Sequence, residues 1–131
     1  MNTKTLNIQA LALLGDAVFS LYVREELLKL GINNPKLIQS ESVKYVSAKS
    51  QSRILSELIN NNLLNEDEID IVRRGRNNKK DNHPKNTDVI TYKLSTGFEA
   101  LLGDLYINNK ERLKEILSYI EVIKWKYMEK M

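Results

Sequence analysis

Two short stretches, far apart in the chain, share a phrase and carry a carboxylate beside it. Residues 12–16 read Ala-Leu-Leu-Gly-Asp, and residues 99–104 read Glu-Ala-Leu-Leu-Gly-Asp. Asp16 and Glu99 both have mainly apolar neighbours in the chain. A carboxylate in such surroundings is costly to desolvate unless it is paired, protonated or bound to a metal ion. Asp16 and Glu99 are therefore the first candidates for chemistry.

A glycine stands inside each phrase, and inside an apolar helix glycine costs about 1 kcal/mol relative to alanine. Close approach of two backbones is the usual reason to keep it, so we expect two helices to cross at Gly15 and Gly103. Glu99 is four residues from Gly103 and shares its face, whereas Asp104 lies about 140° around the helix from Glu99. The crossing therefore brings Glu99, rather than Asp104, toward Asp16.

Two carboxylates from facing helices suit Mg²⁺, which binds oxygen, keeps several waters and often takes only one or two carboxylates. A structural interpretation stands beside this one for each acid. Asp16 would pair with a nearby cation, and Glu99 would lie at the edge of its helix, facing water. The repeated phrase and its two glycines favour the metal site.

The positive charge of the chain is concentrated in one segment. The net charge is +3, but residues 73–85 hold six basic residues and one acidic residue, which leaves the rest of the chain negative. Clustered charge attracts a polyanion more strongly than evenly spread charge; a solvated loop kept basic for solubility is the alternative. The candidate residues for binding such a polyanion are Arg73, Arg74, Arg76, Lys79, Lys80 and Lys85.

Composition excludes several classes of site. There is no cysteine, so disulfides and thiolate metal sites are excluded, and the single histidine leaves no His-based zinc site. A length of 131 residues predicts one domain over residues 1–131 with a single core. Neither a transmembrane run nor a signal-peptide pattern is present. We therefore expect a soluble, cytoplasmic protein without a membrane partner.

Apolar residues recur at helical spacing along most of the chain, and no strand pattern appears. We expect an all-α domain of about six helices, over roughly 6–30, 35–45, 47–60, 66–75, 89–107 and 110–131. Gly31 marks a helix end, and the run from Asn65 to Glu68 reads as a capping box. Residues 77–87 lack periodicity and predict a loop long enough to suggest a function.

These residues resemble a known family. Leu14-Gly15-Asp16-Ala17-Val18 is similar to the signature helix of ribonuclease III, and residues 98–103 are similar to the second acidic helix of that family. The resemblance covers most of the chain, in the family's order and spacing. Residues 46–51, 74–77 and 84–89 resemble more closely the short bacterial form, Mini-III, which has no appended double-stranded-RNA-binding domain.

The resemblance implies a ribonuclease III-like endonuclease domain of six to seven helices that forms a homodimer and needs Mg²⁺, for which Mn²⁺ may substitute. It implies hydrolysis of double-stranded RNA to 5′-phosphate and 3′-hydroxyl ends, with the two sites of the dimer cutting opposite strands. For the Mini-III form it implies a stem in the precursor of large-subunit ribosomal RNA as substrate. Asp16 and Glu99 match the catalytic, metal-binding acids of the family.

The chain departs from the larger family members close to these acids. Gln9 and Ala12 stand where those proteins have further acids, and Thr96 stands where they have an aspartate. We therefore expect a centre with fewer direct carboxylates. Thr96 and Asp88 are candidates for orienting the groups that bind the metal.

Two other functions stay open at this stage. One is an RNA-binding module of the same fold that does not cut, and the other is a helical interaction protein whose basic loop binds an acidic partner. We interpret His83 as a solvated loop residue or a minor RNA contact, and Trp125 and Tyr127 as packing residues of the core or of a dimer. Lys49 fits either an RNA contact or a dimer contact, and the sequence identifies no ribosomal-protein partner.

Overall fold

The computed structural model describes residues 1–78 and 88–129, with the side chains of the last helix up to Ile123. Within these ranges the chain forms six α-helices, one short 3-10 helix and no strand, so the predicted all-α class is confirmed. None of the helices described is long and apolar enough to cross a membrane. The elements are η1 (Thr3–Thr5), α1 (Ile8–Lys29), α2 (Pro35–Val46), α3 (Ala48–Asn60), α4 (Glu66–Arg76), α5 (Val89–Asn108) and α6 (Lys110–Glu129).

Polar side chains cap the starts of α1 to α5. The capping box predicted at the start of α4 is present: Asn65 Oδ1 accepts from the Glu68 N–H, and Glu68 Oε1 accepts from the Asn65 N–H, each at 2.9 Å. Each such cap contributes about 1 kcal/mol to helix stability. The other capping side chains are Asn7, Asn34, Ser47 and Asp88. Gly31 follows the end of α1 at a φ of 90°, as predicted for a helix terminus.

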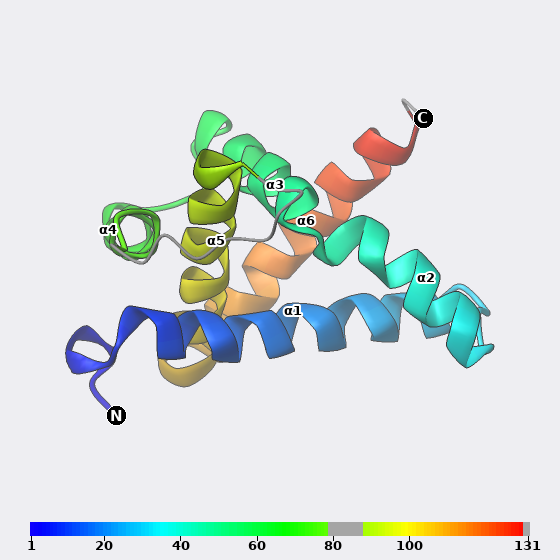
Figure 1. Ribbon diagram of the computed structural model, residues 1–131, viewed down its shortest axis with the longest axis horizontal. Helices are drawn as coiled ribbons and strands as arrows, with labels where there is room; N and C mark the ends of the chain where they lie inside the picture. The colour runs from blue at the N-terminus through cyan, green and yellow to red at the C-terminus, as the bar shows by residue number, and fades with distance from the viewer. Residues whose placement is uncertain (79–87, 130–131) are drawn as a thin grey trace.

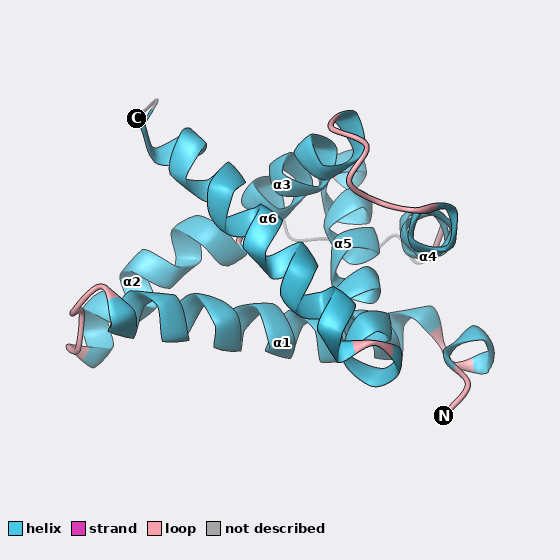
Figure 2. Cartoon of the chain, turned by 180° about the vertical axis from the view of Figure 1, so that it is seen from behind, coloured by secondary structure: helices cyan, strands magenta, loops and turns pink. Residues whose placement is uncertain are grey.

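Helix α5 is the centre of the fold. It packs most extensively against α1, and next against α4 and α3. Figure 1 shows α5 standing across α1, with α4 to one side of it and α3 near its upper end. Seen from behind in Figure 2, α6 crosses the same region diagonally. Two of the contacts of α5, with α1 and with α4, form the walls of the site described below.

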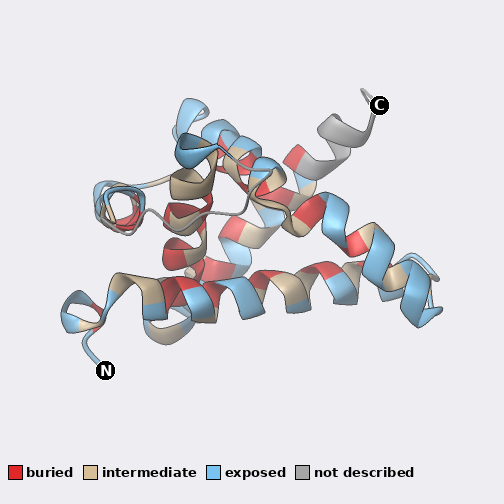
Figure 3. Ribbon diagram, viewed as in Figure 1, coloured by how far each residue is buried: buried red, intermediate tan, exposed pale blue. Residues whose placement is uncertain are grey.

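The core fills the space between α1, α3, α5 and α6, where the buried faces of these helices meet (Figure 3). Phe19 of α1 and Phe98 of α5 are both almost fully buried, and their rings meet edge to face with centroids 5.1 Å apart. Such pairs add about 0.5–1.5 kcal/mol beyond the area that they bury. The residue beside Phe98 is Glu99, so this packing fixes the part of α5 that carries the second acid.

Helix α4 does not fray at Gly75, which the sequence predicted as its end. It continues to Arg76, because Gly75 is buried against α5. A Cβ atom at Gly75 would lie 2.6 Å from the Cα atom of Gly97, and one at Gly97 would lie 2.6 Å from the carbonyl oxygen of Val72. These two glycines therefore allow α4 and α5 to touch backbone to backbone.

Candidate active site

Asp16 and Glu99 are brought together by a contact between two glycines. A Cβ atom at Gly15 would lie 1.6 Å from the carbonyl oxygen of Glu99, and one at Gly103 would lie 2.1 Å from the carbonyl oxygen of Leu11. No side chain fits at either position without separating the helices. The crossing of α1 and α5 predicted from the repeated phrase is therefore confirmed, and it sets Asp16 beside the backbone of Glu99.

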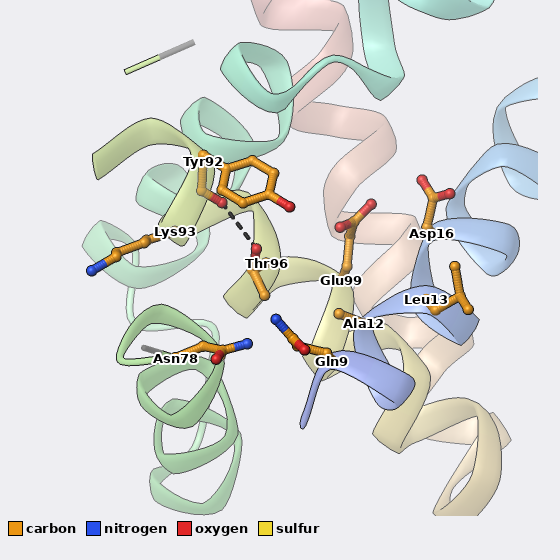
Figure 4. A pocket seen from close by; sticks show the side chains of 10 residues that line it. Gln9, Ala12, Leu13, Asp16, Asn78, Tyr92, Lys93, Thr96 and Glu99 are labelled. Atoms are coloured by element: carbon orange, nitrogen blue, oxygen red, sulfur yellow. Dashed lines mark hydrogen bonds between the residues drawn. The ribbon is translucent and has the colours of Figure 1, made fainter. Parts of the chain in front are cut away.

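The two acids line one open cavity of about 380 Å³ between α1, α4 and α5. Figure 4 shows the carboxyl groups of Asp16 and Glu99 next to each other on one side, with Lys93 and Asn78 on the other. Asp16 is exposed, whereas Glu99 is half-buried. The residues that line the cavity are Gln9, Ala12, Leu13, Asp16, Gly75, Asn78, Tyr92, Lys93, Thr96 and Glu99.

The electrostatic state of Glu99 differs from that of an ordinary surface carboxylate. Burial, and after it the neighbouring Asp16 carboxylate, raise the pKa of Glu99 from 4.5 to about 8. The side-chain amide of Gln51 acts in the opposite direction, since its Nε2–H group donates to Glu99 Oε2 at 3.3 Å. A cation placed between the two acids would favour the charged form of Glu99 and remove the repulsion.

The donor set fits a hard divalent cation. It consists of carboxylate oxygens from two helices, which are the ligands that Mg²⁺ and Mn²⁺ prefer. In the described part of the chain no group of three or more His, Cys, Asp or Glu residues is arranged around a possible metal position. Lys93 lines the same cavity, but its amino group is directed away from the two carboxyl groups in Figure 4. The site therefore offers two carboxylates and room for water.

Asp104 lies away from this cavity, as its position on the helix predicts. Its Oδ1 accepts from the side-chain amide of Asn108 at 3.1 Å. It lines a different cavity, together with Glu68 and Arg112. The second copy of the phrase thus contributes Glu99, and not its own aspartate, to the site.

The two residues expected to support the metal ligands have different places. Thr96 lines the cavity, and its hydroxyl donates to the carbonyl oxygen of Tyr92 at 3.1 Å. Asp88 caps α5, where its carboxylate accepts from the N–H and the hydroxyl of Thr91, each at 2.8 Å. It does not line the cavity. Gln9 and Ala12 do line it.

Within the basic segment 73–85, the residues that the structure describes lie outside the cavity lining. Arg73 pairs with Asp70 at 3.6 Å on the surface, and Arg74 donates to the carbonyl oxygen of Leu6 at 3.3 Å. Arg76 is exposed at the end of α4. Lys79, Lys80, His83 and Lys85 lie outside the described residues.

Several residues at or beside the site were not predicted from the sequence, among them Tyr92, Lys93 and Gln51. Tyr92, Thr96 and Glu99 are spaced i, i+4 and i+7, which places them on one face of a helix. That spacing was the available signal for Tyr92. Lys93 follows on the same turn. For Gln51 the sequence offered no comparable signal, because its contact with α5 depends on how α3 packs.

The chain is similar to known proteins over most of its length. The profile of the Ribonuclease III domain family matches residues 9–110. Mini-ribonuclease 3 of Streptococcus pneumoniae is 42% identical over 120 residues, which is 91% of this chain and 94% of the relative. Mini-ribonuclease 3 of Staphylococcus aureus is 42% identical over 121 residues, covering 92% and 90% of the two chains.

A solved structure supports the same comparison at the level of the fold. A crystal structure of a protein from Fusobacterium nucleatum aligns with a TM-score of 0.78 and 32% sequence identity, covering 94% of this chain and 95% of the other. The matched region includes both helices that carry Asp16 and Glu99.

Proposed function

Because this chain belongs to the ribonuclease III family, as a Mini-ribonuclease 3 homologue, we propose that Asp16 and Glu99 are its catalytic, metal-binding residues. The chain is a metal-dependent endoribonuclease of the ribonuclease III type, which acts on double-stranded RNA. The observation that carries the assignment is the pair of carboxyl groups held side by side in one cavity by the contact of Gly15 with Gly103. The whole chain, residues 1–131, acts as a single catalytic domain in this proposal.

The metal is Mg²⁺ in this proposal, and Mn²⁺ substitutes for it. When bound, such an ion polarises a phosphoryl oxygen and lowers the pKa of a bound water. Asp16 and Glu99 hold the ion by their carboxylate oxygens, and Thr96, on the same face of α5 as Glu99, orients groups around it. Asp88 is the weaker candidate for such a role, since Thr91 already occupies its carboxylate.

The substrate lies across the mouth of the cavity. A-form RNA is recognised largely through its shape, its phosphates and its 2′-hydroxyl groups, so the cations near the cavity matter more than base-reading side chains. Lys93 lines the wall opposite the acids and is well placed to meet a phosphate. In the basic segment, the proposed RNA-binding residues are Arg76, Lys79, Lys80 and Lys85, which contact phosphates, with Arg73 and Arg74 at the base of the segment.

Cleavage leaves 5′-phosphate and 3′-hydroxyl ends, and the substrate is a stem in the precursor of large-subunit ribosomal RNA. Both are proposals that rest on the Mini-ribonuclease 3 similarity. Among the described residues that line the cavity there is no third carboxylate, which distinguishes this site from a fuller two-metal arrangement.

The working unit is a homodimer in this proposal. Three leucines on the outer side of α1 support it: Leu13 is 73% exposed, Leu21 65% and Leu28 55%. Large apolar side chains gathered along one helix are typical of an interaction surface. Leu13 also lines the cavity, so a second copy docked on this surface would lie beside the first active site.

The test compares two aspartates that occupy the same place in the repeated phrase. With Mg²⁺, the wild-type protein is expected to cut a duplex RNA, and a chelator is expected to stop it. Asp16→Asn should abolish cleavage, whereas Asp104→Asn, outside the cavity, should cut like the wild type. Equal cleavage by the wild type and Asp16→Asn would remove Asp16 from the site. Binding of the duplex without any cleavage by the wild type would favour an RNA-binding module instead.

A further inference from the structure

We propose that Gln51 is a positioning residue for Glu99, because its buried side-chain amide joins the Glu99 carboxylate to the junction of α2 and α3. This inference rests on the proposed role of Glu99 as a metal ligand. Gln51 Nε2 lies 3.3 Å from Glu99 Oε2 and 3.0 Å from the carbonyl oxygen of Val46. Gln51 thus ties an acid of the active site to a helix junction that does not line the cavity.

The orientation of this amide follows from the backbone. The carbonyl oxygen of Val46 can only accept a hydrogen bond, so the amide must turn its Nε2 toward it. The same nitrogen carries the second hydrogen that reaches Glu99. Gln51 therefore presents a donor, and not an acceptor, to the carboxylate, which favours its charged, metal-binding form.

Packing alone does not account for a glutamine at position 51, because the side chain is almost fully buried. Gln51 is 1% exposed, and it shares the buried face of α3 with Ile54, Leu55 and Leu58. Its Oε1 atom is buried without a hydrogen-bond partner. An unpaired buried acceptor loses its hydration without compensation, and a Met or Leu of similar size would avoid that cost. The side-chain amide of Gln51 is therefore explained by the hydrogen bond that its N–H group donates to Glu99.

The position of Gln51 on α3 makes the contact rigid. The side chain of Ser47 caps α3 and accepts from the Ser50 N–H at 3.2 Å, and the Gln51 N–H donates to the carbonyl oxygen of Ser47 at 2.9 Å. Gln51 lies in this first turn, directly beyond the end of α2. The backbone of Gln51 is thus fixed in the first turn of α3, and its Nε2 group bonds both Val46 and Glu99. This limits rotation of the Glu99 carboxylate about its last bond.

The test uses Gln51→Met, which keeps the size of the side chain and removes the amide. Its matched control is Ser47→Ala, which weakens the same helix junction without touching Glu99. Binding of Mn²⁺ to the protein without RNA is followed by the loss of the electron paramagnetic resonance signal of free Mn²⁺. The Mg²⁺ concentration that gives half-maximal cleavage and the melting temperature are measured for the same proteins.

Gln51→Met is expected to weaken Mn²⁺ binding about 10-fold or more, which is usual for residues that orient metal ligands. The half-maximal Mg²⁺ concentration should rise by a similar factor, while cleavage at saturating Mg²⁺ changes less. Ser47→Ala should lower the melting temperature and leave both metal measurements within about twofold of the wild type. Gln51→Met with wild-type metal binding would overturn the proposal, whatever its melting temperature.

A measurement on the wild type keeps the proposal testable if Gln51→Met does not fold. The side-chain NH₂ resonances of Gln51 should shift when Mg²⁺ is added, and they should stay unchanged in Asp16→Asn. Resonances that do not respond to Mg²⁺ in a protein that binds the ion would overturn the role of Gln51. A wild-type protein that neither binds Mn²⁺ nor cuts duplex RNA would instead overturn the proposed function.

Discussion

The buried Glu68 and the half-buried Glu99 have pKa values shifted in opposite directions. The Glu68 side chain is only 5% exposed, and Arg112 donates to both of its oxygens at 2.8 Å. Burial by itself would raise the pKa of Glu68, but the bonds from Arg112 and from the Asn65 N–H hold it below its ordinary value. Glu68 is a compensated charge that joins α4 to α6.

Glu99 differs from Glu68 because no cation pairs with its carboxylate in the described part of the chain. Its nearest charged neighbour is a second acid, Asp16, and burial with this neighbour raises its pKa to about 8. Holding two acids next to each other costs the folded protein free energy, and a cation bound between them would remove that cost. The difference between the two glutamates separates the acid that holds the fold together, Glu68, from the acid that is available to bind a ligand, Glu99.

The largest expected effect on activity comes from replacing Glu99 alone by glutamine. Glu99→Gln should lower cleavage of duplex RNA by more than about 100-fold, the upper range for residues that merely support a metal site. It should leave the free energy of unfolding unchanged or higher at pH 8, because it removes the repulsion with Asp16. Cleavage assays and urea unfolding check the two halves of this prediction.

Glu68→Gln is the matched change at the other glutamate. It should lower stability and leave the activity of each folded molecule near that of the wild type. If the two variants lost activity equally while both were folded, the separation of the two roles would be wrong.

Arg112→Met should destabilise the protein by about 3–5 kcal/mol, because it leaves the Glu68 carboxylate buried without its partner. Urea unfolding measures the effect. The control on the same helix is Lys114→Met, whose ion pair with Glu111 joins two side chains that are 76% and 87% exposed. Such surface pairs contribute about 0–1 kcal/mol. Similar losses for both variants would contradict the description of Glu68 as a buried, compensated charge.

Gly15→Ala should cost about 1–3 kcal/mol by overpacking the helix crossing, and it should weaken metal binding. The added Cβ atom would lie 1.6 Å from the carbonyl oxygen of Glu99, so α1 and α5 must separate. Gly31→Ala serves as control: no atom lies within 4 Å of the added Cβ, and only the positive φ is strained. It should cost stability without changing the Mg²⁺ requirement. A Gly15→Ala protein with unchanged metal binding would separate the crossing from the site.

The smallest effect is the pH dependence of the metal-free protein. Glu99 has a higher pKa in the folded protein than its ordinary 4.5, so the folded state holds the proton longer and stability falls as the pH rises from about 4.5 to about 8. Glu68 has a lowered pKa, so its stabilisation is present above 4.5 and is lost as the pH falls through the folded value.

Urea unfolding in the presence of a chelator, from pH 3 to pH 8, measures both slopes. Glu99→Gln should remove the slope near neutral pH, and Glu68→Gln should reduce the loss in acid. A neutral slope that persists in Glu99→Gln would assign it to another group.

Local signals predicted the helices well because they act over a few residues. The capping box at Asn65 and the helix end before Gly31 depend on neighbours in the chain, and both are confirmed. The crossing at Gly15 and Gly103 was predicted from a repeated phrase, which is a local signal seen twice. The related contact of Gly75 with Gly97 was missed, because no shared phrase joins the two glycines.

The parts of the site that escaped prediction depend on the packing of elements distant in sequence. In the sequence, Gln51 looks like an ordinary polar residue of α3. Only the packing of α3 against α5 brings it into contact with Glu99. Glu68 was read correctly as part of a capping box, but its pairing with Arg112, on another helix, was not. Side chains that cross between helices are visible only once the helices are packed.

The glycine contact between α1 and α5 also matters for protein engineering. Peptide atoms, and not core side chains, set the separation of these two helices at the acids. Core positions away from the crossing, such as the fully buried Ile116 of α6, are therefore open to redesign for thermal stability without altering the spacing of Asp16 and Glu99. By the same reasoning, α1 and α5 form a two-helix unit that could be transplanted into another helical scaffold, provided that both glycines are carried with it.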